Sequence, residues 1–263
     1  MRGRSYIGII CALLLCQVAW GQRTVSSIPA PNGFERIHPQ GFGHYLQSFP
    51  LKPEGTLVRY FDGSIKPWQD GAFAVLDIDV GDKDLQQCAD AVMRLRAEYL
   101  WQERQYQLIH FNFTNAFCAD YTKWAQGYRI KIQGNKASWY KAAEEDYQYE
   151  TFRKYLEMVF NYAGTASLSK ELVPVQVADL TIGDIFIVGG HPGHAMIIVD
   201  MATDVSGRKA ILVAQSYMPA QSIHIVTNIV DRAHSPWYIL DNDTTIFVFP
   251  EWCFDSSQIK RFQ

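Results

Sequence analysis

The stretch IGDIFIVGGHPGHAMIIVD, from Ile182 to Asp200, indicates how the second half of the chain folds. It contains two apolar, largely β-branched runs, Asp184–Val188 and Ala195–Met201, each with the length and composition of a short strand. The glycine-rich segment between the two runs is a turn signal. We therefore expect two neighbouring strands joined by a glycine loop, with His194 where the second strand begins.

The same strand pattern continues toward the C-terminus. Turn signals such as Ser206-Gly207 and Ser235-Pro236 separate further short runs of this kind. The additional predicted strands are Ala210–Ser216, Ser222–Thr227 and Thr245–Phe249. Short strands separated by closely spaced turns are typical of an antiparallel sheet.

Helices dominate the first half. Apolar residues recur at spacings of three and four from Leu85 to Gln102, with Asp84 as the expected N-cap, and again from Tyr149 to Tyr162. The other predicted elements of this half are a short aromatic helix over Phe117–Gln126 and strands over Gly71–Val80 and Gln107–Phe113. Because helices and strands are segregated along the chain, the predicted class is α+β, not a doubly wound parallel fold.

The N-terminal segment, residues 1–21, has the pattern of a secretory signal peptide. Two arginines precede an apolar run from Ile7 to Leu15, and Ala19-Trp20-Gly21 is a small-x-small cleavage pattern. Cys16 raises the question of a lipid anchor, but Leu15 stands where a lipoprotein signal carries a small residue. We therefore expect simple cleavage and an exported protein, periplasmic or secreted.

After the signal, we expect an irregular arm and one folded domain. Residues 22–56 are rich in Pro, Gly and Ser and show little apolar periodicity. Residues 57–263 form the predicted single α+β domain, helix-rich over 57–172 and sheet-rich over 173–263.

Composition excludes several classes of protein. Hydrophobic residues make up 48% and aromatic residues 14% of the 263 residues, which excludes a disordered chain. The formal net charge of −3 gives no global reason to expect a nucleic-acid partner. After the signal, no apolar run approaches the roughly 20 residues that a membrane-spanning helix needs.

Three cysteines remain after the predicted cleavage, Cys88, Cys118 and Cys253. Since three is odd, at least one thiol is free or pairs with another chain in an oxidising compartment. Two of the three lie near expected helix starts, Cys88 in the first turn after Asp84 and Cys118 at the beginning of Phe117–Gln126. Cys253 follows the sheet and is expected to serve in packing.

The order of motifs from Ile182 to Ser216 resembles that of NlpC-type papain-like cell-wall peptidases and related amidases. In those enzymes a strand opened by Gly-Asp precedes a strand whose first residue is the catalytic histidine. The resemblance assigns that role to His194, and it assigns the orientation of the histidine to Gln215, a polar residue on the following strand. A longer similarity, notable at Ala214–Gln221, is to a family of secreted bacterial proteins known only as a domain of unknown function.

A papain-like mechanism implies a cysteine at a helix N-terminus, where the helix dipole and a histidine favour the thiolate. Cys88 is the best candidate for this nucleophile and Cys118 the second, and the order Cys88, His194, Gln215 is that of the unpermuted papain arrangement. The chain departs from the NlpC pattern in one respect. The helix before the Gly-Asp strand, Tyr149–Tyr162, carries no cysteine at its start.

Two functional hypotheses therefore stand side by side. In the first, the protein is an exported thiol hydrolase that acts on amide bonds, with cell-wall peptides as candidate substrates. In the second, it is a non-catalytic relative that binds an envelope peptide or glycan in an aromatic-lined cleft. The aromatic residues that suggest this cleft, or alternatively core packing, are Tyr121, Trp124, Tyr128, Trp139, Tyr140, Tyr147, Tyr149, Trp237 and Tyr238. A buried structural role is the alternative for Cys88.

A metal or cofactor is not expected. His191 and His194 are three residues apart, but Pro192 and Gly193 prevent them from sharing a helical face. The remaining candidate zinc ligands, Asp200, His224 and His234, follow no recognised spacing. Asp77 and Asp79 on one strand face lack a second partner for glycoside chemistry, so a solvated face is the expected explanation.

Overall fold

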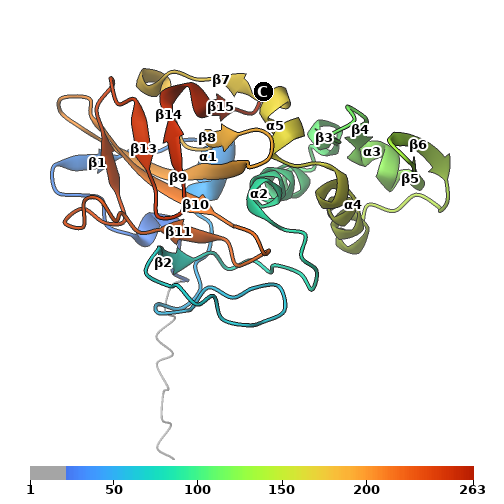
Figure 1. Cartoon of the computed structure of the whole chain (residues 1–263), viewed down its shortest axis with the longest axis horizontal. Helices are drawn as coiled ribbons and strands as arrows, with labels where there is room; N and C mark the ends of the chain where they lie inside the picture. Colours follow the sequence, from blue (N-terminus) through green and yellow to red (C-terminus); the bar gives the residue numbers. More distant parts are fainter. Residues whose placement is uncertain (1–21) are drawn as a thin grey trace, which may run out of the picture.

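The computed structural model describes residues 22–263, so the predicted signal peptide and Cys16 lie outside the described residues. Its centre is an antiparallel sheet whose strand order differs from the chain order. The strands run β2-β11-β10-β9-β8-β15-β7, with β1 added beside β9 and β12 beside β10 (Figure 1). The sheet strands are β1 (Phe34–Arg36), β2 (Ala72–Val75), β7 (Val173–Pro174), β8 (Ile185–Val188), β9 (His194–Asp204), β10 (Lys209–Gln215), β11 (His224–Val226), β12 (Tyr238–Leu240) and β15 (Ile259–Arg261).

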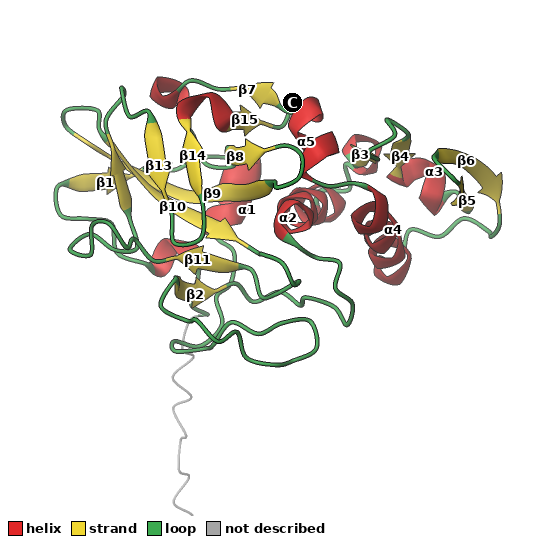
Figure 2. Ribbon diagram, in the orientation of Figure 1, coloured by secondary structure: helices red, strands yellow, loops and turns green. Residues whose placement is uncertain are grey.

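The helices and three small hairpins complete the fold. The helices are α1 (Gly41–Gln47), α2 (Cys88–Gln102), α3 (Tyr121–Ala125), α4 (Tyr149–Tyr162) and α5 (Thr165–Glu171). The hairpins pair β3 (His110–Asn112) with β4 (Cys118–Asp120), β5 (Tyr128–Gln133) with β6 (Lys136–Lys141), and β13 (Ile246–Val248) with β14 (Cys253–Asp255). Within the described residues the α-helices all lie between Gly41 and Glu171, and strands β7 to β15 follow without a further α-helix, which agrees with the α+β prediction (Figure 2).

Strand β9 lies at the centre of the core and is buried on both faces. Helices α1 and α2 pack against one face of the sheet, while the hairpin β13–β14 covers the other (Figure 1). On the hairpin side, the ring of Phe186 from β8 lies 4.8 Å from Phe247 and 5.2 Å from Phe249, measured between ring centroids. A strand with two buried faces needs a continuous apolar sequence, which is what residues 195–199 provide.

The glycine loop between β8 and β9 places His194 at the start of its strand. The two strands are antiparallel with Val188 opposite His194, so the loop is short and tight. A side chain on Gly193 would collide with the Thr165 hydroxyl of α5 and with the carbonyl oxygen of Val188. Glycine is therefore required here by the close approach of α5, and the predicted pair of strands is confirmed.

Several predicted boundaries are confirmed and others are wrong. Helix α4 spans Tyr149–Tyr162, as predicted. Helix α2 begins at Cys88 and not at Leu85, because the Asp84 carboxylate accepts a hydrogen bond from the backbone of Ala220 instead of capping a helix. Phe117–Gln126 is not one helix: Cys118 lies in strand β4, and Asp120 caps the short α3.

The segment predicted as an irregular arm, residues 22–56, contains strand β1 and helix α1. These elements meet β9 through the carboxylate of Asp200, which is fully buried. It accepts hydrogen bonds from Gln47 Nε2 at 2.6 Å, Arg36 Nε at 2.8 Å and the Met201 backbone N–H at 2.8 Å. In residues 22–263 no helix is long and apolar enough to cross a membrane.

The Arg36–Asp200 ion pair gives a test of how strongly this segment is held. Arg36→Ala leaves the carboxylate of Asp200 buried without its charged partner, so we expect the free energy of unfolding to fall by about 3 kcal/mol. Urea unfolding followed by circular dichroism measures the change. The matched control is Arg208→Ala, which breaks an ion pair whose arginine is half exposed and is expected to cost about 1 kcal/mol or less. Equal losses in the two variants would contradict a structural role for Asp200.

Candidate functional site

Cys88 is the first residue of α2. Two hydrogen bonds of Gln87, the residue before it, fix the start of the helix. The Gln87 backbone N–H donates to Asp90 Oδ2 at 3.0 Å, and the Gln87 carbonyl oxygen accepts from the Ala91 backbone N–H at 2.9 Å. The first backbone N–H groups of a helix have no partner within it, so they present partial positive charge at this end. The structure therefore places Cys88 closer to the helix N-terminus than the sequence predicted.

His194 lies at the first position of β9 with only 1% of its surface exposed. Its ring is enclosed by aromatic side chains, with centroid distances of 4.9 Å to Tyr217 and 5.2 Å to Trp252. The ring nitrogen Nε2 is 2.8 Å from Gln215 Oε1, at the end of the neighbouring strand β10. The structure thus brings the predicted histidine and amide into contact.

The orientation of the Gln215 amide follows from its other neighbours. Gln215 Nε2 lies 2.7 Å from Glu251 Oε2, and both Glu251 oxygens accept from Lys66 Nζ at 2.7 Å. An ionised carboxylate only accepts hydrogen bonds, so the Gln215 NH2 group must face Glu251 and its oxygen must face His194. His194 consequently carries its proton on Nε2, which leaves the Nδ1 lone pair free.

A second buried histidine agrees with this assignment. His224 Nδ1 lies 2.9 Å from the carbonyl oxygen of Ser222 and therefore carries a proton. Its Nε2, an acceptor, is 3.5 Å from Gln215 Nε2 and faces the second amide hydrogen. The sequence did not single out Lys66 or Glu251, and no local motif marks them, because they lie more than 30 positions from Gln215 in sequence.

Cys88 and His194 approach each other across the boundary between α2 and β9. The backbone N–H of Ala195, the residue after His194, lies close enough to the Cys88 sulfur to lower the pKa of the thiol. Tyr217 also lies near Cys88, since besides burial the charge of a Cys88 thiolate raises the pKa of the Tyr217 hydroxyl. Within residues 22–263, however, no hydrogen bond joins the Cys88 thiol to the His194 ring.

The Cys88 thiol and the His194 imidazole are both neutral at pH 7. Burial and, to a lesser extent, the adjacent Asp90 carboxyl raise the pKa of the Cys88 thiol to about 11, whereas nearby backbone N–H groups act to lower it. Burial also lowers the pKa of His194 to about 4, although the bond to Gln215 opposes this change. The resting state is therefore a thiol beside a neutral imidazole, not a thiolate–imidazolium ion pair.

A cavity of about 260 Å³ opens onto Cys88. Its wall includes the glycine loop before β9, Thr165 at the start of α5, and Asp90. Asp90 is 6% exposed, and its Oδ1 has no hydrogen-bond partner among the described residues. The ring of His194 does not line this cavity, so a ligand in it would contact Cys88 and not the imidazole.

The other candidate residues lie elsewhere. Cys118 and Cys253 are exposed on the hairpin strands β4 and β14, and neither begins a helix, so Cys253 does not have the packing role predicted for it. Of the aromatic clusters, Tyr121, Trp124 and Trp237 belong to the core. Asp79 is bound by Arg94 and Arg153 and does not face a second catalytic carboxylate.

Three of the residues considered as zinc ligands have other partners. His234 bonds Asp231 in an exposed loop, Asp200 pairs with Arg36, and His224 belongs to the Gln215 network. Throughout residues 22–263, no group of three or more His, Cys, Asp or Glu side chains is arranged to hold a metal ion.

Comparison with known proteins identifies the family but not an activity. The family described as Domain of unknown function (4846) matches residues 25–261. The chain belongs to this family. No curated protein and no solved structure matches the chain. The longer of the two similarities seen in the sequence, to a family of unknown function, is thereby confirmed.

The depressed histidine pKa values predict how stability depends on pH. The folded state holds the pKa of His194 and of His224 at about 4, below the ordinary value of 6.5, so the unfolded chain binds protons more readily between these values. Stability is therefore complete above about pH 6.5 and is lost as the pH falls toward 4, by about 1.4 kcal/mol per pH unit for each histidine.

Urea unfolding between pH 4 and 7 measures this slope. We expect His194→Gln to have a shallower slope than the unsubstituted protein by about 1.4 kcal/mol per pH unit. His38→Gln, which replaces an exposed histidine, is the control and keeps the full slope. An unchanged slope in His194→Gln would show that the imidazole is not held neutral by burial.

Proposed function

We propose that the protein is a papain-like thiol hydrolase that cleaves amide bonds, with Cys88 as nucleophile, His194 as general base and acid, and Gln215 as the residue that orients the imidazole. The observation that carries this proposal is the contact of His194 Nε2 with Gln215 Oε1 at 2.8 Å, beside a cysteine that begins a helix. This bond leaves Nδ1, the other ring nitrogen, available as a base.

The chemistry follows from the neutral resting state. As Cys88 Sγ attacks a carbonyl carbon, its proton passes to His194 Nδ1, and the unpaired N–H groups at the start of α2 stabilise the developing oxyanion. The imidazolium then gives this proton to the leaving nitrogen, so the C–N bond breaks and a thioester remains. Water, deprotonated by His194, hydrolyses the thioester and releases the acid and the free thiol.

The substrate class rests on sequence and on the cavity. The resemblance over Ile182–Ser216 points to peptide amide bonds, and the expected signal peptide points to an exported protein that meets the cell wall. The buried, unpartnered Asp90 Oδ1 beside Cys88 offers an acceptor for an N–H group of such a substrate. We therefore propose cell-wall peptides as the substrate.

A non-catalytic binding protein is the second candidate, and particular observations favour it. The Cys88 thiol has a raised pKa and the His194 ring is enclosed by Tyr217 and Trp252, whereas a reactive thiol needs a lowered pKa. A larger cavity lined by aromatic side chains, including Tyr45 and Tyr99, is present next to α2. In this case the Cys88 site has no catalytic function, and the ligand binds in the larger cavity.

Peptide hydrolysis decides between the two candidates. The purified protein without its first 21 residues is incubated with soluble peptidoglycan fragments, and new amines and products are followed by mass spectrometry. We expect cleavage that Cys88→Ser and His194→Gln each reduce by about a thousandfold or more. Cys253→Ser, which changes an exposed cysteine, is the matched control and retains activity. Folded protein that cleaves none of the fragments, or a fully active Cys88→Ser variant, refutes the hydrolase.

Glu251 provides a test of the orienting network. Glu251→Gln replaces an obligatory acceptor with a group that donates as well as accepts, so the Gln215 amide is no longer forced to present its oxygen to His194. We expect kcat to fall by about tenfold or more with KM little changed. Glu54→Gln, an exposed change of the same kind, serves as control. A larger effect on KM than on kcat would assign Glu251 to substrate binding instead of positioning.

A further inference from the structure

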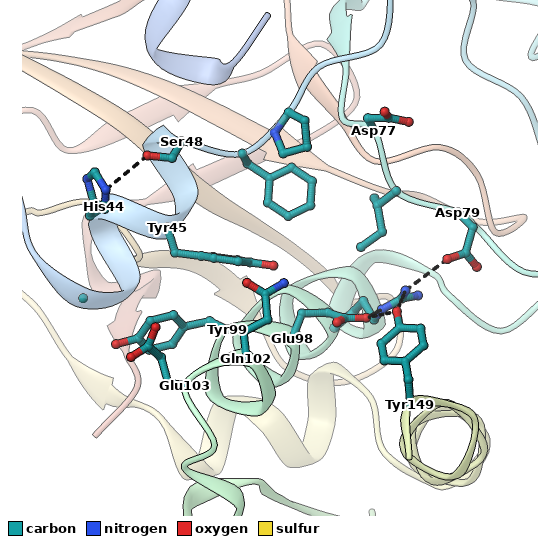
Figure 3. Close-up of a pocket in the computed structure, with 15 residues that line it drawn as sticks. His44, Tyr45, Ser48, Asp77, Asp79, Glu98, Tyr99, Gln102, Glu103 and Tyr149 are labelled. Atoms are coloured by element: carbon teal, nitrogen blue, oxygen red, sulfur yellow. Dashed lines mark hydrogen bonds and ion pairs between the residues drawn. The ribbon is translucent and has the colours of Figure 1, made fainter. Parts of the chain in front are cut away.

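A second, larger cavity of about 690 Å³ lies between α1 and α2 (Figure 3). None of its lining residues is shared with the cavity at Cys88. It is formed by α2 from Arg94 to its C-cap Glu103, by α1, and by the segment around Asp77 that follows β2. Its volume is in the range of small-molecule sites.

The wall of this cavity contains a buried ion pair. Arg94 Nε donates to Glu98 Oε1 at 2.6 Å, and only 1% and 6% of the two side chains are exposed. The other donors of Arg94 bond Gln86 Oε1 at 2.7 Å, and Asp79 Oδ2 and the Tyr149 hydroxyl at 3.1 Å each. Since Arg94 is surrounded by acceptors, it is not available to bind an anion.

Two polar atoms on the same wall have no partner. Glu98 Oε1 accepts from both Arg94 and Tyr149, whereas no described residue donates to Glu98 Oε2. The Tyr45 hydroxyl likewise forms no hydrogen bond within residues 22–263. Figure 3 shows the Tyr45 ring across the cavity with its hydroxyl directed toward Glu98 and Gln102. Glu98 Oε2 is not sealed off from solvent, so it can accept a charge-assisted hydrogen bond from a cationic ligand in the cavity.

The charge and the surface of the cavity indicate the kind of donor. Its lining includes Asp77, Asp79, Glu98 and Glu103 but a single permanent cation, Arg94. Aromatic rings form its apolar surface, with the centroid of Tyr45 5.6 Å from Tyr99 and 5.4 Å from Phe49. Excess negative charge beside aromatic faces is the environment that cations prefer.

We propose that the cavity between α1 and α2 binds an alkylammonium group, which donates to Glu98 Oε2 and contacts the rings of Tyr45 and Tyr99. The ammonium donates to the one Glu98 oxygen that Arg94 and Tyr149 leave free, and its alkyl chain covers the apolar surface. This site does not depend on hydrolysis at Cys88, because it shares no residue with that cavity.

Calorimetric titration of the folded protein tests the site. The probe is Nα-acetyl-L-lysine amide, and the comparison probe is the norleucine analogue, which has a similar side chain without the ammonium. We expect the lysine derivative to bind at least about tenfold more tightly than the norleucine derivative, as a charge-assisted hydrogen bond requires. N-acetylglucosamine, a neutral sugar that also stacks on aromatic rings, is expected not to compete.

Three variants of lining residues and one control variant locate the binding. Glu98→Gln and Tyr45→Phe are each expected to weaken the lysine probe, by about tenfold and about threefold, while the exposed change Glu54→Gln leaves its affinity unaltered. Asp77→Asn at the rim removes one charge without touching the Arg94 network and is expected to weaken binding about twofold to fivefold, so it decides the matter if Glu98→Gln does not fold. Equal binding of the two amino-acid probes, preferential binding of the sugar, or no binding of the lysine probe overturns the proposal.

Discussion

The carboxylate of Glu251 determines the state of the site around His194. Because it only accepts hydrogen bonds and is held by Lys66, it turns the Gln215 amide so that Oε1 faces the imidazole at 2.8 Å. The histidine tautomer follows from that orientation, and so does the free nitrogen that the proposed chemistry uses. Glu251 lies between the small hairpin strands β13 and β14, so this hairpin both covers the core and aligns the histidine.

The electrostatics of Cys88 show two opposing influences on one thiol. The N-terminus of α2 favours a thiolate by about 0.3–1 kcal/mol, as helix ends do for anions. Burial and the neighbouring Asp90 act in the other direction and prevail, since the pKa of the thiol rises to about 11. In the proposed mechanism the thiolate therefore forms only as the proton moves to His194.

Local signals account for what the sequence predicted well. The apolar runs around Ile185 and Ile197 and the periodicity of Tyr149–Tyr162 specify elements that need no distant contact to be recognised. The start of α2 depends instead on a hydrogen bond from Ala220 to Asp84, 136 positions away, and was misplaced. The hairpin β5–β6 is not among the predicted elements, although Gly134-Asn135 at its turn is a hairpin signal. Glu251 and Lys66 have no local signature, because their function depends only on tertiary contact with Gln215.

Helix α2 connects the two cavities through Arg94. A buried guanidinium requires acceptors for its donors, and one of those acceptors is Gln86 Oε1, two residues before Cys88. The backbone oxygen of Gln86 in turn accepts from the Ser216 hydroxyl at 3.0 Å, and Ser216 follows Gln215. The turn that presents the thiol is thus fixed on one side to the wall of the larger cavity and on the other to the strand that carries the orienting amide. The ion pair of Arg94 with Glu98 consequently supports the geometry at Cys88 as well as the proposed ammonium site.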